Sequence, residues 1–286
     1  MSTHPQPAGK NLTANGLNLH YLEWGRPEAP PPSGTIVCVH GYTSSADAFN
    51  ALARRLGDRA HIIALDVRGH GKSAWSPEGA YGYADQAADL AAAVDVLVPQ
   101  PFVLIGTSMG GIIAMAYAAQ HPARLRGLVI NDIGPDPEAG SQRITGMVAS
   151  RPDSFASLDA AMEYRRQSSP ITAARPLDDQ RELALGVLRQ QSDGSWRWKM
   201  DPAYIEQRIT RGAPKRPALW PALAALPCPT LVVWGSDSDV LLEAQARRMV
   251  ATLPRGTLVA VPGVGHAPTL VEPPVLAALE PFLAAV

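Results

Sequence analysis

Apolar residues occur along the chain in two alternating kinds of segment. Short, continuous apolar runs lie at 35–41, 61–66, 102–106, 127–132, 230–235 and 257–263. The segments between them carry apolar residues three or four positions apart, as on one face of a helix. Continuous runs rich in β-branched residues are typical of strands buried on both faces. Because strands separated by helices form right-handed crossovers, the pattern predicts a mostly parallel α/β sheet covered by helices.

The first part and the middle of the chain depart from this alternation. Near the N-terminus, Asn15-Gly16 stands between alternating apolar residues, which predicts a two-stranded hairpin. From about residue 134 to 219 no strand-like apolar run occurs, and the segment is polar and helix-prone. The pattern therefore predicts about eight strands in an α/β core at 1–133 and 220–286, with a helical cap or lid at 134–219, inserted before the penultimate strand.

The length and charge of the chain limit the kinds of molecule that we expect it to bind. The chain has 286 residues and a formal net charge of −1, which gives no electrostatic reason to expect nucleic acid or an anionic membrane. The first residues lack the apolar stretch of a signal peptide, and no window approaches the length of a membrane-spanning helix. We expect a cytoplasmic protein that acts on a small molecule, and its oligomeric state stays open.

Signals for metal, disulfide or phosphate chemistry are weak. Cys38 and Cys228 stand apart in or beside apolar runs, so we expect buried thiols. No histidine or cysteine pair has the spacing of metal ligands. The stretch DVRGHGKS contains Gly-Lys-Ser without the spacing of a phosphate-binding loop, and we expect Asp66 and Arg68 to form a buried, charge-paired turn. The sequence predicts neither a metal nor a cofactor.

The strongest chemical signal is FVLIGTSMGG, which runs from Phe102 to Gly111. It contains G-x-S-x-G where an apolar run passes into a helix, the context that a nucleophile elbow requires. Small residues on either side of Ser108 let strand and helix pass closely, so a strained turn can present the hydroxyl. The helix that begins at Met109 also offers free N–H groups to an oxyanion. Ser108 is the predicted nucleophile; the alternative is a serine that only caps the helix.

Two further motifs agree with this prediction. VHGYTSS places His40-Gly41 at the end of an earlier apolar run, and a tight turn there can aim the backbone N–H of Tyr42 at the point that the N–H of Met109 faces. Together they would form a two-donor oxyanion hole. Of the seven histidines, only His266 lies in a glycine-rich loop directly after a strand. His266 is the predicted base, and His40 is expected to be structural.

By these motifs the sequence resembles the α/β-hydrolase superfamily over nearly its whole length. The resemblance rests on HGYTSS, DVRGHGKS, GTSMGG and GVGHAPTLVEP, and on the order of strands, cap and final histidine. It implies a serine nucleophile, a late histidine base, an acid and an oxyanion hole. The serine at position 108 argues against the haloalkane dehalogenase and epoxide hydrolase branches, which use a carboxylate nucleophile.

The acid is open between two aspartates. In the superfamily the acid usually follows the strand after the cap, three residues beyond a glycine. Here that glycine is Gly235, and the position three residues later holds Ser238, between Asp237 and Asp239. Some branches take the acid from the strand before the cap, which gives Asp132. A helix of about twelve residues descends roughly 18 Å and a strand of about five rises roughly 17 Å, which returns Asp132 to the edge where Ser108 lies. Asp132 is preferred and Asp239 is the alternative, although both could be capping residues.

These residues predict a serine hydrolase that cleaves a carboxylic ester, thioester, lactone or amide through an acyl-enzyme. Apolar and aromatic residues of the cap predict a small to medium, mostly apolar substrate, and Trp196 and Trp198 either line the pocket or anchor the cap. Because a fold does not fix the chemistry, C–C bond hydrolysis, acyl transfer and cofactor-free lyase or oxygenase chemistry stay open. A ligand-sensing protein with little turnover is the alternative from another class.

Overall fold

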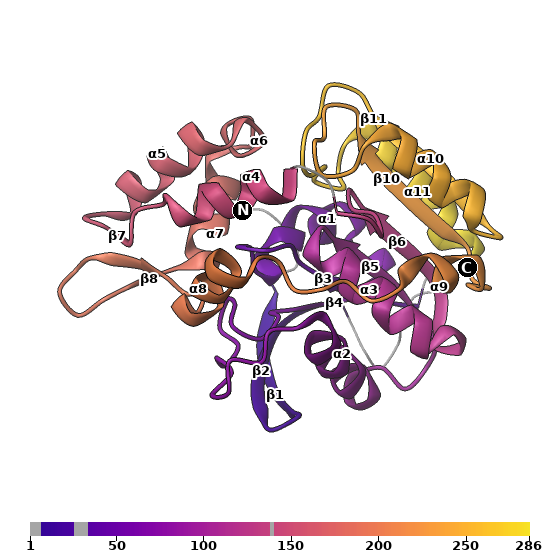
Figure 1. Cartoon of the computed structure of the whole chain (residues 1–286), viewed down its shortest axis with the longest axis horizontal. Helices are drawn as coiled ribbons and strands as arrows, with labels where there is room; N and C mark the ends of the chain where they lie inside the picture. The colour runs from indigo at the N-terminus through magenta and orange to yellow at the C-terminus, as the bar shows by residue number, and fades with distance from the viewer. Residues whose placement is uncertain (1–6, 26–33, 138–139) are drawn as a thin grey trace.

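Eight strands form one sheet in the computed structural model, which describes residues 7–25, 34–137 and 140–286 (Figure 1). The strands are β1 (Ala8–Ala14), β2 (Leu17–Trp24), β3 (Thr35–Val39), β4 (His61–Leu65), β5 (Phe102–Thr107), β6 (Leu125–Asn131), β10 (Thr230–Gly235) and β11 (Gly256–Val261). Their order is β1-β2-β4-β3-β5-β6-β10-β11. The β1–β2 and β2–β4 pairs are antiparallel and every other pair is parallel. The predicted, mostly parallel sheet is confirmed.

Each predicted apolar run forms a strand, with small shifts at the ends. The hairpin at Asn15-Gly16 joins β1 and β2, and its two turn residues have φ angles of 48° and 74°. Positive φ at both positions gives a turn whose twist matches that of the strands. Local turn chemistry therefore sets the register of the first strand pair.

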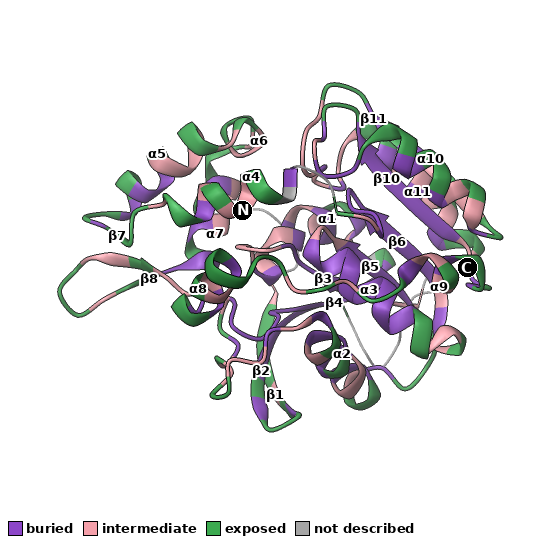
Figure 2. Cartoon of the chain, viewed as in Figure 1, coloured by how far each residue is buried: buried purple, intermediate pink, exposed green. Residues whose placement is uncertain are grey.

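Helices cover both faces of the sheet (Figure 1). They are α1 (Asn50–Leu56), α2 (Tyr83–Leu97), α3 (Met109–Gln120), α9 (Leu219–Ala224), α10 (Glu243–Thr252) and α11 (Pro273–Ala285), with 3-10 turns η1 (Ala46–Phe49), η2 (Gly57–Arg59) and η3 (Pro122–Arg124). Helices α1 and α11 share a hydrophobic cluster with one face, and α2, α3, α9 and α10 with the other. The central strands between these layers are buried (Figure 2). Within the described ranges, no helix is long and apolar enough to cross a membrane.

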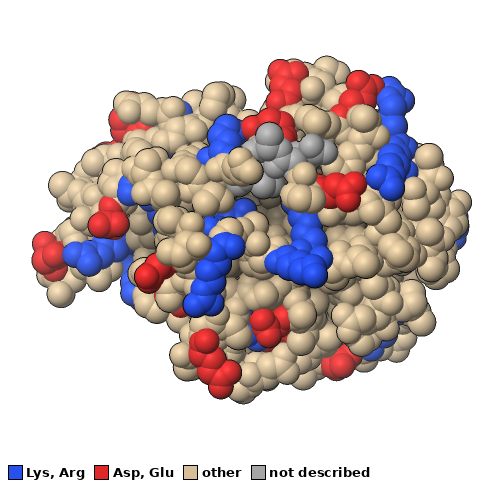
Figure 3. All heavy atoms as spheres, in the orientation of Figure 1, with Lys and Arg blue, Asp and Glu red and all other residues tan. Residues whose placement is uncertain are grey.

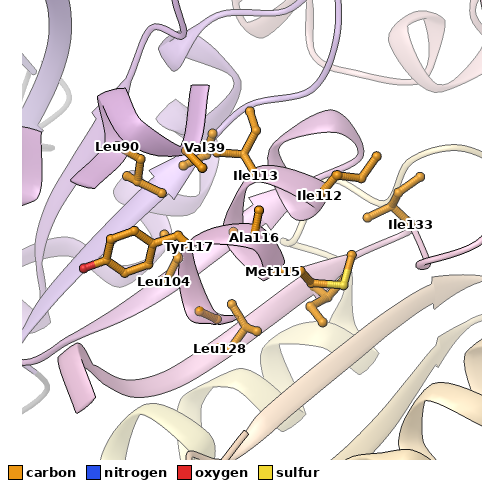
Figure 4. Close-up of a cluster of buried hydrophobic side chains, with 14 of the residues drawn as sticks. Val39, Leu90, Leu104, Ile112, Ile113, Met115, Ala116, Tyr117, Leu128 and Ile133 are labelled. Atoms are coloured by element: carbon orange, nitrogen blue, oxygen red, sulfur yellow. The ribbon is translucent and has the colours of Figure 1, made fainter. Parts of the chain in front are cut away.

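Helix α3 is apolar on all sides. Its sequence, MGGIIAMAYAAQ, is buried except at the C-terminal end. Figure 4 shows its side chains packed with Leu90 of α2, Leu104 of β5 and Leu128 of β6. A helix without a polar face needs cover on every side. The residue that precedes α3, Ser108, is therefore attached to one of the most firmly enclosed elements of the molecule.

The segment 134–219, which we call the insert, leaves the sheet at the carboxyl end of β6 and lies to one side of it (Figure 1). Its helices are α4 (Gly140–Ala149), α5 (Leu158–Ser168), α6 (Pro170–Ala173), α7 (Leu177–Val187) and α8 (Pro202–Arg211). It also holds a small antiparallel sheet in the order β7-β9-β8, formed by β7 (Ser154–Phe155), β8 (Leu188–Gln190) and β9 (Trp196–Trp198). The prediction of a purely helical segment is therefore wrong, because the insert also contains this sheet.

The small sheet escapes prediction because its strands are too short to show an alternating pattern. A signal was nevertheless present in Asp193-Gly194, a typical hairpin dipeptide between β8 and β9, where Gly194 has a φ of 85°. The sheet and helices of the insert enclose a small hydrophobic cluster of their own, which includes Phe155, Met162 and Leu188. The insert therefore does not rely on the large sheet alone for its packing.

The two cysteines are free and buried, as predicted. Burial raises the pKa of both Cys38 and Cys228, which disfavours the reactive thiolate. In the part of the chain that the structure describes, no three His, Cys, Asp or Glu side chains are grouped so that they could hold a metal ion.

Candidate active site

Ser108 lies at the turn between β5 and α3, with φ 53° and ψ −119°. A residue with a side chain is strained in this left-handed region. Glycines make the turn possible, because a Cβ on Gly106 would lie 2.4 Å from the carbonyl oxygen of Gly110. One on Gly110 would lie 2.1 Å from that of Val39. The G-x-S-x-G motif thus holds Ser108 at the tip of a turn that larger neighbours would not permit.

His266 contacts both Ser108 and Asp132. Its Nε2 lies 2.8 Å from Ser108 Oγ, and its Nδ1 lies 2.8 Å from Asp132 Oδ2. Because an ionised carboxylate can only accept a hydrogen bond, Nδ1 carries the hydrogen and Nε2 accepts the hydroxyl hydrogen of Ser108. This is the geometry that a serine nucleophile, a histidine base and an orienting acid require.

The carboxylate of Asp132 is held at both oxygens. Its side chain is fully buried, and the oxygen that does not face His266 accepts a hydrogen bond of 3.1 Å from the N–H of Gly235. Its own N–H donates to the carbonyl oxygen of Val233, at 2.8 Å. With a φ of 56°, Asp132 turns out of the β6 ladder at this point. The backbone of β10 therefore fixes the position from which Asp132 reaches His266.

Asp239, the alternative acid, binds a different partner. Its Oδ1 lies 2.8 Å from Nη2 of Arg143, on α4 of the insert. The hydrogen bonds and charge of Arg143 lower the pKa of Asp239. In the described part of the chain Asp239 makes no hydrogen bond to His266. The geometry therefore brings Asp132, rather than Asp239, to the histidine.

Ser238 stands where the superfamily usually has its acid, and it has a structural role. Its side chain is buried, and its Oγ accepts hydrogen bonds of 3.2 Å from the N–H groups of Val240 and Leu241. Asp237 beside it is exposed. The hydroxyl satisfies the backbone of the turn after β10, which a carboxylate directed at His266 could not do at the same time.

Asn131 is a part of the site that the sequence analysis does not single out. Its Nδ2 donates to Thr107 Oγ1 at 3.1 Å and to the carbonyl oxygen of Pro268 at 2.8 Å. One buried amide thus joins the end of β5 to the loop that follows His266. The signal that could have identified it is a polar residue at the buried carboxyl end of a strand, directly before Asp132.

The predicted oxyanion donors lie next to Ser108. A Cβ on Gly41 would be 3.2 Å from the Cβ of Ser108, so the loop that continues to Tyr42 passes directly beside the hydroxyl. The N–H of Met109 is the first of α3 and has no partner within the helix. Neither it nor the N–H of Tyr42 donates a hydrogen bond to any described residue. Both remain available, and their role as oxyanion donors stays a prediction.

His40 is fully buried beneath this loop. Its Nδ1 lies 2.8 Å from the carbonyl oxygen of Gly41, and its Nε2 accepts a hydrogen bond of 3.0 Å from the N–H of Val67. Burial lowers the pKa of His40. Since one nitrogen donates and the other accepts, the neutral imidazole fits both partners. His40 supports the backbone beside Ser108, in agreement with the structural role expected of it.

The expected pairing of Asp66 with Arg68 is wrong. Asp66 lies 2.8 Å from Nδ1 of His20 and accepts a hydrogen bond of 2.7 Å from the N–H of Ala46. Arg68 pairs with Asp89 instead, with Nη2 2.6 Å from Oδ1. Both charges are buried and paired, but each partner comes from a distant element. Closeness in the sequence therefore did not identify the partners.

Trp196 and Trp198 pack against the cluster of the insert. The ring of Trp198 lies 5.6 Å from that of Phe155, and its Nε1 donates to the carbonyl oxygen of Pro152 at 2.8 Å. These contacts anchor β9 within the insert. A role for either tryptophan in lining the substrate pocket stays a prediction.

A pocket of about 490 Å³ opens between the two ends of the insert. Its walls come from residues 135–137 and 213–221, and Arg208 of α8 also lines it. The guanidinium carbon of Arg208 lies 4.3 Å from the ring centre of Tyr42. Arg208 thus lies between this pocket and Tyr42, whereas Ser108, Asp132 and His266 do not line the pocket.

Known proteins share this sequence and fold. The chain matches the family model of the alpha/beta hydrolase fold over residues 34–273. It is 31% identical over 282 residues to the 3-hydroxybutyrate-oligomer hydrolase of Cupriavidus necator, which covers 95% of this chain and 94% of that protein. It is 27% identical over 245 residues to an esterase of Mycobacterium tuberculosis, covering 84% of this chain and 76% of the esterase. The crystal structure of an alpha/beta hydrolase from Novosphingobium aromaticivorans has a TM-score of 0.85 and 31% identity, with 99% of each chain covered. The chain therefore belongs to the α/β-hydrolase fold family and is a hydrolase.

Proposed function

We propose that the protein is a serine esterase that cleaves a small to medium carboxylic ester through an acyl-enzyme. The observation that carries this proposal is the hydrogen-bonded series of Ser108, His266 and Asp132, with 2.8 Å at each step. Relatives named as an esterase and as an oligomer hydrolase support an ester as the bond that is cleaved.

In the first half-reaction Ser108 Oγ attacks the ester carbonyl carbon and its proton passes to Nε2 of His266. The carbonyl electron pair moves onto oxygen, and the N–H groups of Tyr42 and Met109 bind the oxyanion. Asp132 stabilises the imidazolium through its bond to Nδ1–H. When the intermediate collapses, the bond to the alcohol oxygen breaks, and that oxygen takes the proton from Nε2. The alcohol leaves and the acyl group stays on Ser108.

In the second half-reaction water attacks the acyl carbon and gives a proton to Nε2 of His266. The oxyanion forms again at the same two N–H groups. Collapse then breaks the bond between the acyl carbon and Ser108 Oγ, which recovers its proton from Nε2 as the acid departs. His266 thus acts as base and then as acid in each half-reaction, and its side chain is only 10% exposed.

We also propose that the insert forms a cap over this site. Two ion pairs support the proposal, because they join the insert to the sheet region on different sides. Arg54 of α1 lies 2.6 Å from Asp179 of α7, and Arg143 of α4 binds Asp239, which follows β10. A segment attached in this way limits the size of substrate that can reach Ser108.

The serine is tested with a fluorophosphonate probe and with 4-nitrophenyl butyrate. We expect the wild-type protein to be labelled and to hydrolyse the ester, and Ser108→Ala to lose labelling and at least about 10⁴-fold in kcat. Ser168→Ala, which changes an exposed serine of the insert, serves as control and should behave as wild type. Labelling that persists in Ser108→Ala, or a wild type without labelling or turnover, would contradict the proposal.

A further inference from the structure

Three arginines of the insert have no acidic partner. Arg151 follows α4, Arg165 lies in the last turn of α5, and Arg175 lies between α6 and α7. All three are half-buried, yet none of their guanidinium groups forms an ion pair or a hydrogen bond with a described residue. The guanidinium carbon of Arg151 lies 4.3 Å from the ring centre of Trp198. Charged side chains away from the surface are normally paired, so the cluster needs an explanation.

Arg165 is the most enclosed member of the cluster. Its Nε is buried without a hydrogen-bond partner in the structure. Burial lowers the pKa of Arg165 to about 10, and the positive charges of Arg175 and Arg151 add to the effect. The C-terminal end of α5 attracts a cation, but it supplies no acceptor for this Nε. The guanidinium therefore holds donors that the protein itself does not use.

The acidic side chains near Arg175 are engaged elsewhere. Asp179 accepts from Nη2 of Arg54 at 2.6 Å. Glu272 accepts at Oε1 from the N–H and the hydroxyl of Thr269, at 2.6 and 2.8 Å. Burial lowers the pKa of Arg175 by more than Asp179 and Glu272 raise it, and neither carboxylate lies within ion-pair distance. Asp153 raises the pKa of Arg151, but by less than burial lowers it, and no described carboxylate forms an ion pair with any of the three arginines.

The cluster lies where the insert meets the predicted oxyanion loop. The guanidinium carbon of Arg208 lies 4.3 Å from the ring centre of Tyr42, and its Nε donates to Thr145 of α4 at 3.2 Å. Helix α4, which Arg151 follows, is therefore near this loop, and the charge of Arg151 opposes the rise that burial causes in the pKa of Tyr42. The ring of Trp198, against which Arg151 lies, is 6.5 Å from that of Tyr164, the neighbour of Arg165 in α5. A substrate that extends from Ser108 towards the insert would meet these arginines.

Several basic residues elsewhere lie among acidic side chains or have hydrogen-bond partners. On the face shown in Figure 3, Lys and Arg side chains are interspersed with Asp and Glu. In the pocket of about 490 Å³, Arg208 Nε donates to Thr145 Oγ1 at 3.2 Å, and Arg216 Nη1 donates to the carbonyl oxygen of Asp136 at 2.8 Å. The arginine cluster is therefore not part of a generally basic surface.

We propose that Arg151, Arg165 and Arg175 form an anion site that binds a carboxylate of the substrate. The preferred ester then carries a free carboxylate at the end remote from the scissile bond. This inference rests on the proposed esterase function, and it refines the mostly apolar substrate that the sequence predicts. Planar guanidinium groups bind carboxylates through two parallel hydrogen bonds. The nearby carboxylates of Asp179 and Glu272 favour one negative charge over the two of a phosphate.

Matched pairs of esters that differ only in charge test the proposal. One pair is monomethyl and dimethyl adipate, and the other is acetoxyhexanoate and its methyl ester, which place the carboxylate on the acyl and on the alcohol side. With hydrolysis followed by pH-stat, we expect the anion of at least one pair to have about 10-fold or more the kcat/KM of its neutral partner. Equal rates within both pairs, or a preference for the neutral esters, would overturn the anion site.

Substitution of Arg165 tests the assignment of the residues. In Arg165→Gln the ratio of anionic to neutral kcat/KM should fall to about one, mainly through a higher KM for the anion. Arg166→Gln is the matched control, because Arg166 is the next residue of α5 and pairs at the surface with Glu163. That variant should keep the ratio of the wild type. An unchanged ratio in Arg165→Gln would show that this arginine does not bind the carboxylate.

A binding measurement separates this inference from the esterase proposal. Calorimetric titration of monomethyl adipate into Ser108→Ala should detect binding that is lost in Ser108→Ala/Arg165→Gln. If this binding is found but wild type cleaves no ester, the anion site stands and the esterase proposal fails. If esters are cleaved but the anion does not bind, the esterase proposal stands and the anion site fails. Tighter binding of inorganic phosphate than of monomethyl adipate would contradict the assignment to a carboxylate.

Discussion

The carboxyl edge of the large sheet and the insert differ in how their charged side chains are partnered. At the sheet edge, Asp132 is bonded at both carboxylate oxygens, and Asn131 donates to two other elements. His266 binds Asp132 on one side and Ser108 on the other. The positions come from the backbone of neighbouring strands, which cannot shift without breaking the ladder. Chemistry that depends on such positions tolerates little change.

The insert contains charged side chains that lack an acidic partner. It has a small hydrophobic cluster of its own, and it packs on the sheet region through Tyr204, which belongs to the main core, and through ion pairs such as that of Arg54 with Asp179. Arg165 has a buried Nε without a partner. The contrast indicates that the sheet edge supplies the reacting groups and the insert supplies recognition. Substitutions should accordingly change the rate of the chemical step at the sheet edge, and substrate preference in the insert.

The largest change in rate is expected from a substitution of Asp132, the predicted acid at the sheet edge. Asp132→Asn should lower kcat for 4-nitrophenyl butyrate by about 10³ to 10⁴-fold, because an amide neither fixes the tautomer of His266 nor stabilises its charge. Asp239→Asn is the matched control, since it breaks the half-exposed pair with Arg143 and should change kcat by less than about threefold. A greater loss in Asp239→Asn than in Asp132→Asn would reverse the assignment of the acid.

The same contrast explains how far the sequence could predict the molecule. Strands such as β10, predicted at 230–235 and found there, can be predicted from the sequence because burial on both faces requires a continuous apolar run. Ser108 and His266 were identified because each lies in a glycine-rich turn after a strand. Local sequence carries these features, since each depends on residues a few positions apart.

Features that depend on distant partners could not be predicted in this way. Asp132 and Asp239 both follow strands at the same edge of the sheet. The left-handed φ of Asp132 and the pairing of Asp239 with Arg143, 96 residues away, distinguish them. The cluster around Arg165 likewise joins three elements of the insert, and no spacing in the sequence indicates that its members meet.

A pH-dependent effect of intermediate size is expected from His70, buried at the boundary between the two regions. Burial lowers the pKa of His70 to about 3, and the neighbouring His40 adds to the effect. An unfolded histidine has a pKa of about 6.5. Below that pH, His70 binds a proton in the unfolded chain but not in the folded protein. The free energy of unfolding therefore falls as the pH falls.

Urea unfolding of wild type and His70→Gln at several pH values measures this contribution. From pH 7 to pH 5 the wild type should lose about 2 kcal/mol more than the variant, because one proton contributes about 1.4 kcal/mol per pH unit below the unfolded pKa. Circular dichroism at pH 7 is the control that the variant is folded. Parallel stability curves for the two proteins would show that His70 does not hold a depressed pKa.

The smallest effects compare two glycines in helices of the insert. A Cβ on Gly146 of α4 would meet nothing within 4 Å, whereas one on Gly186 of α7 would lie 2.4 Å from Ser45 Oγ and 2.6 Å from Asp47 Oδ2. Gly146→Ala should raise the free energy of unfolding by about 0.5–1 kcal/mol, since alanine favours a helix. Gly186→Ala should lower it by about 1–3 kcal/mol, because the methyl group displaces the bonded pair of Ser45 and Asp47. Urea unfolding compares the two variants. Equal changes in the free energy of unfolding would mean that α7 does not pack against η1 as tightly as in the structure.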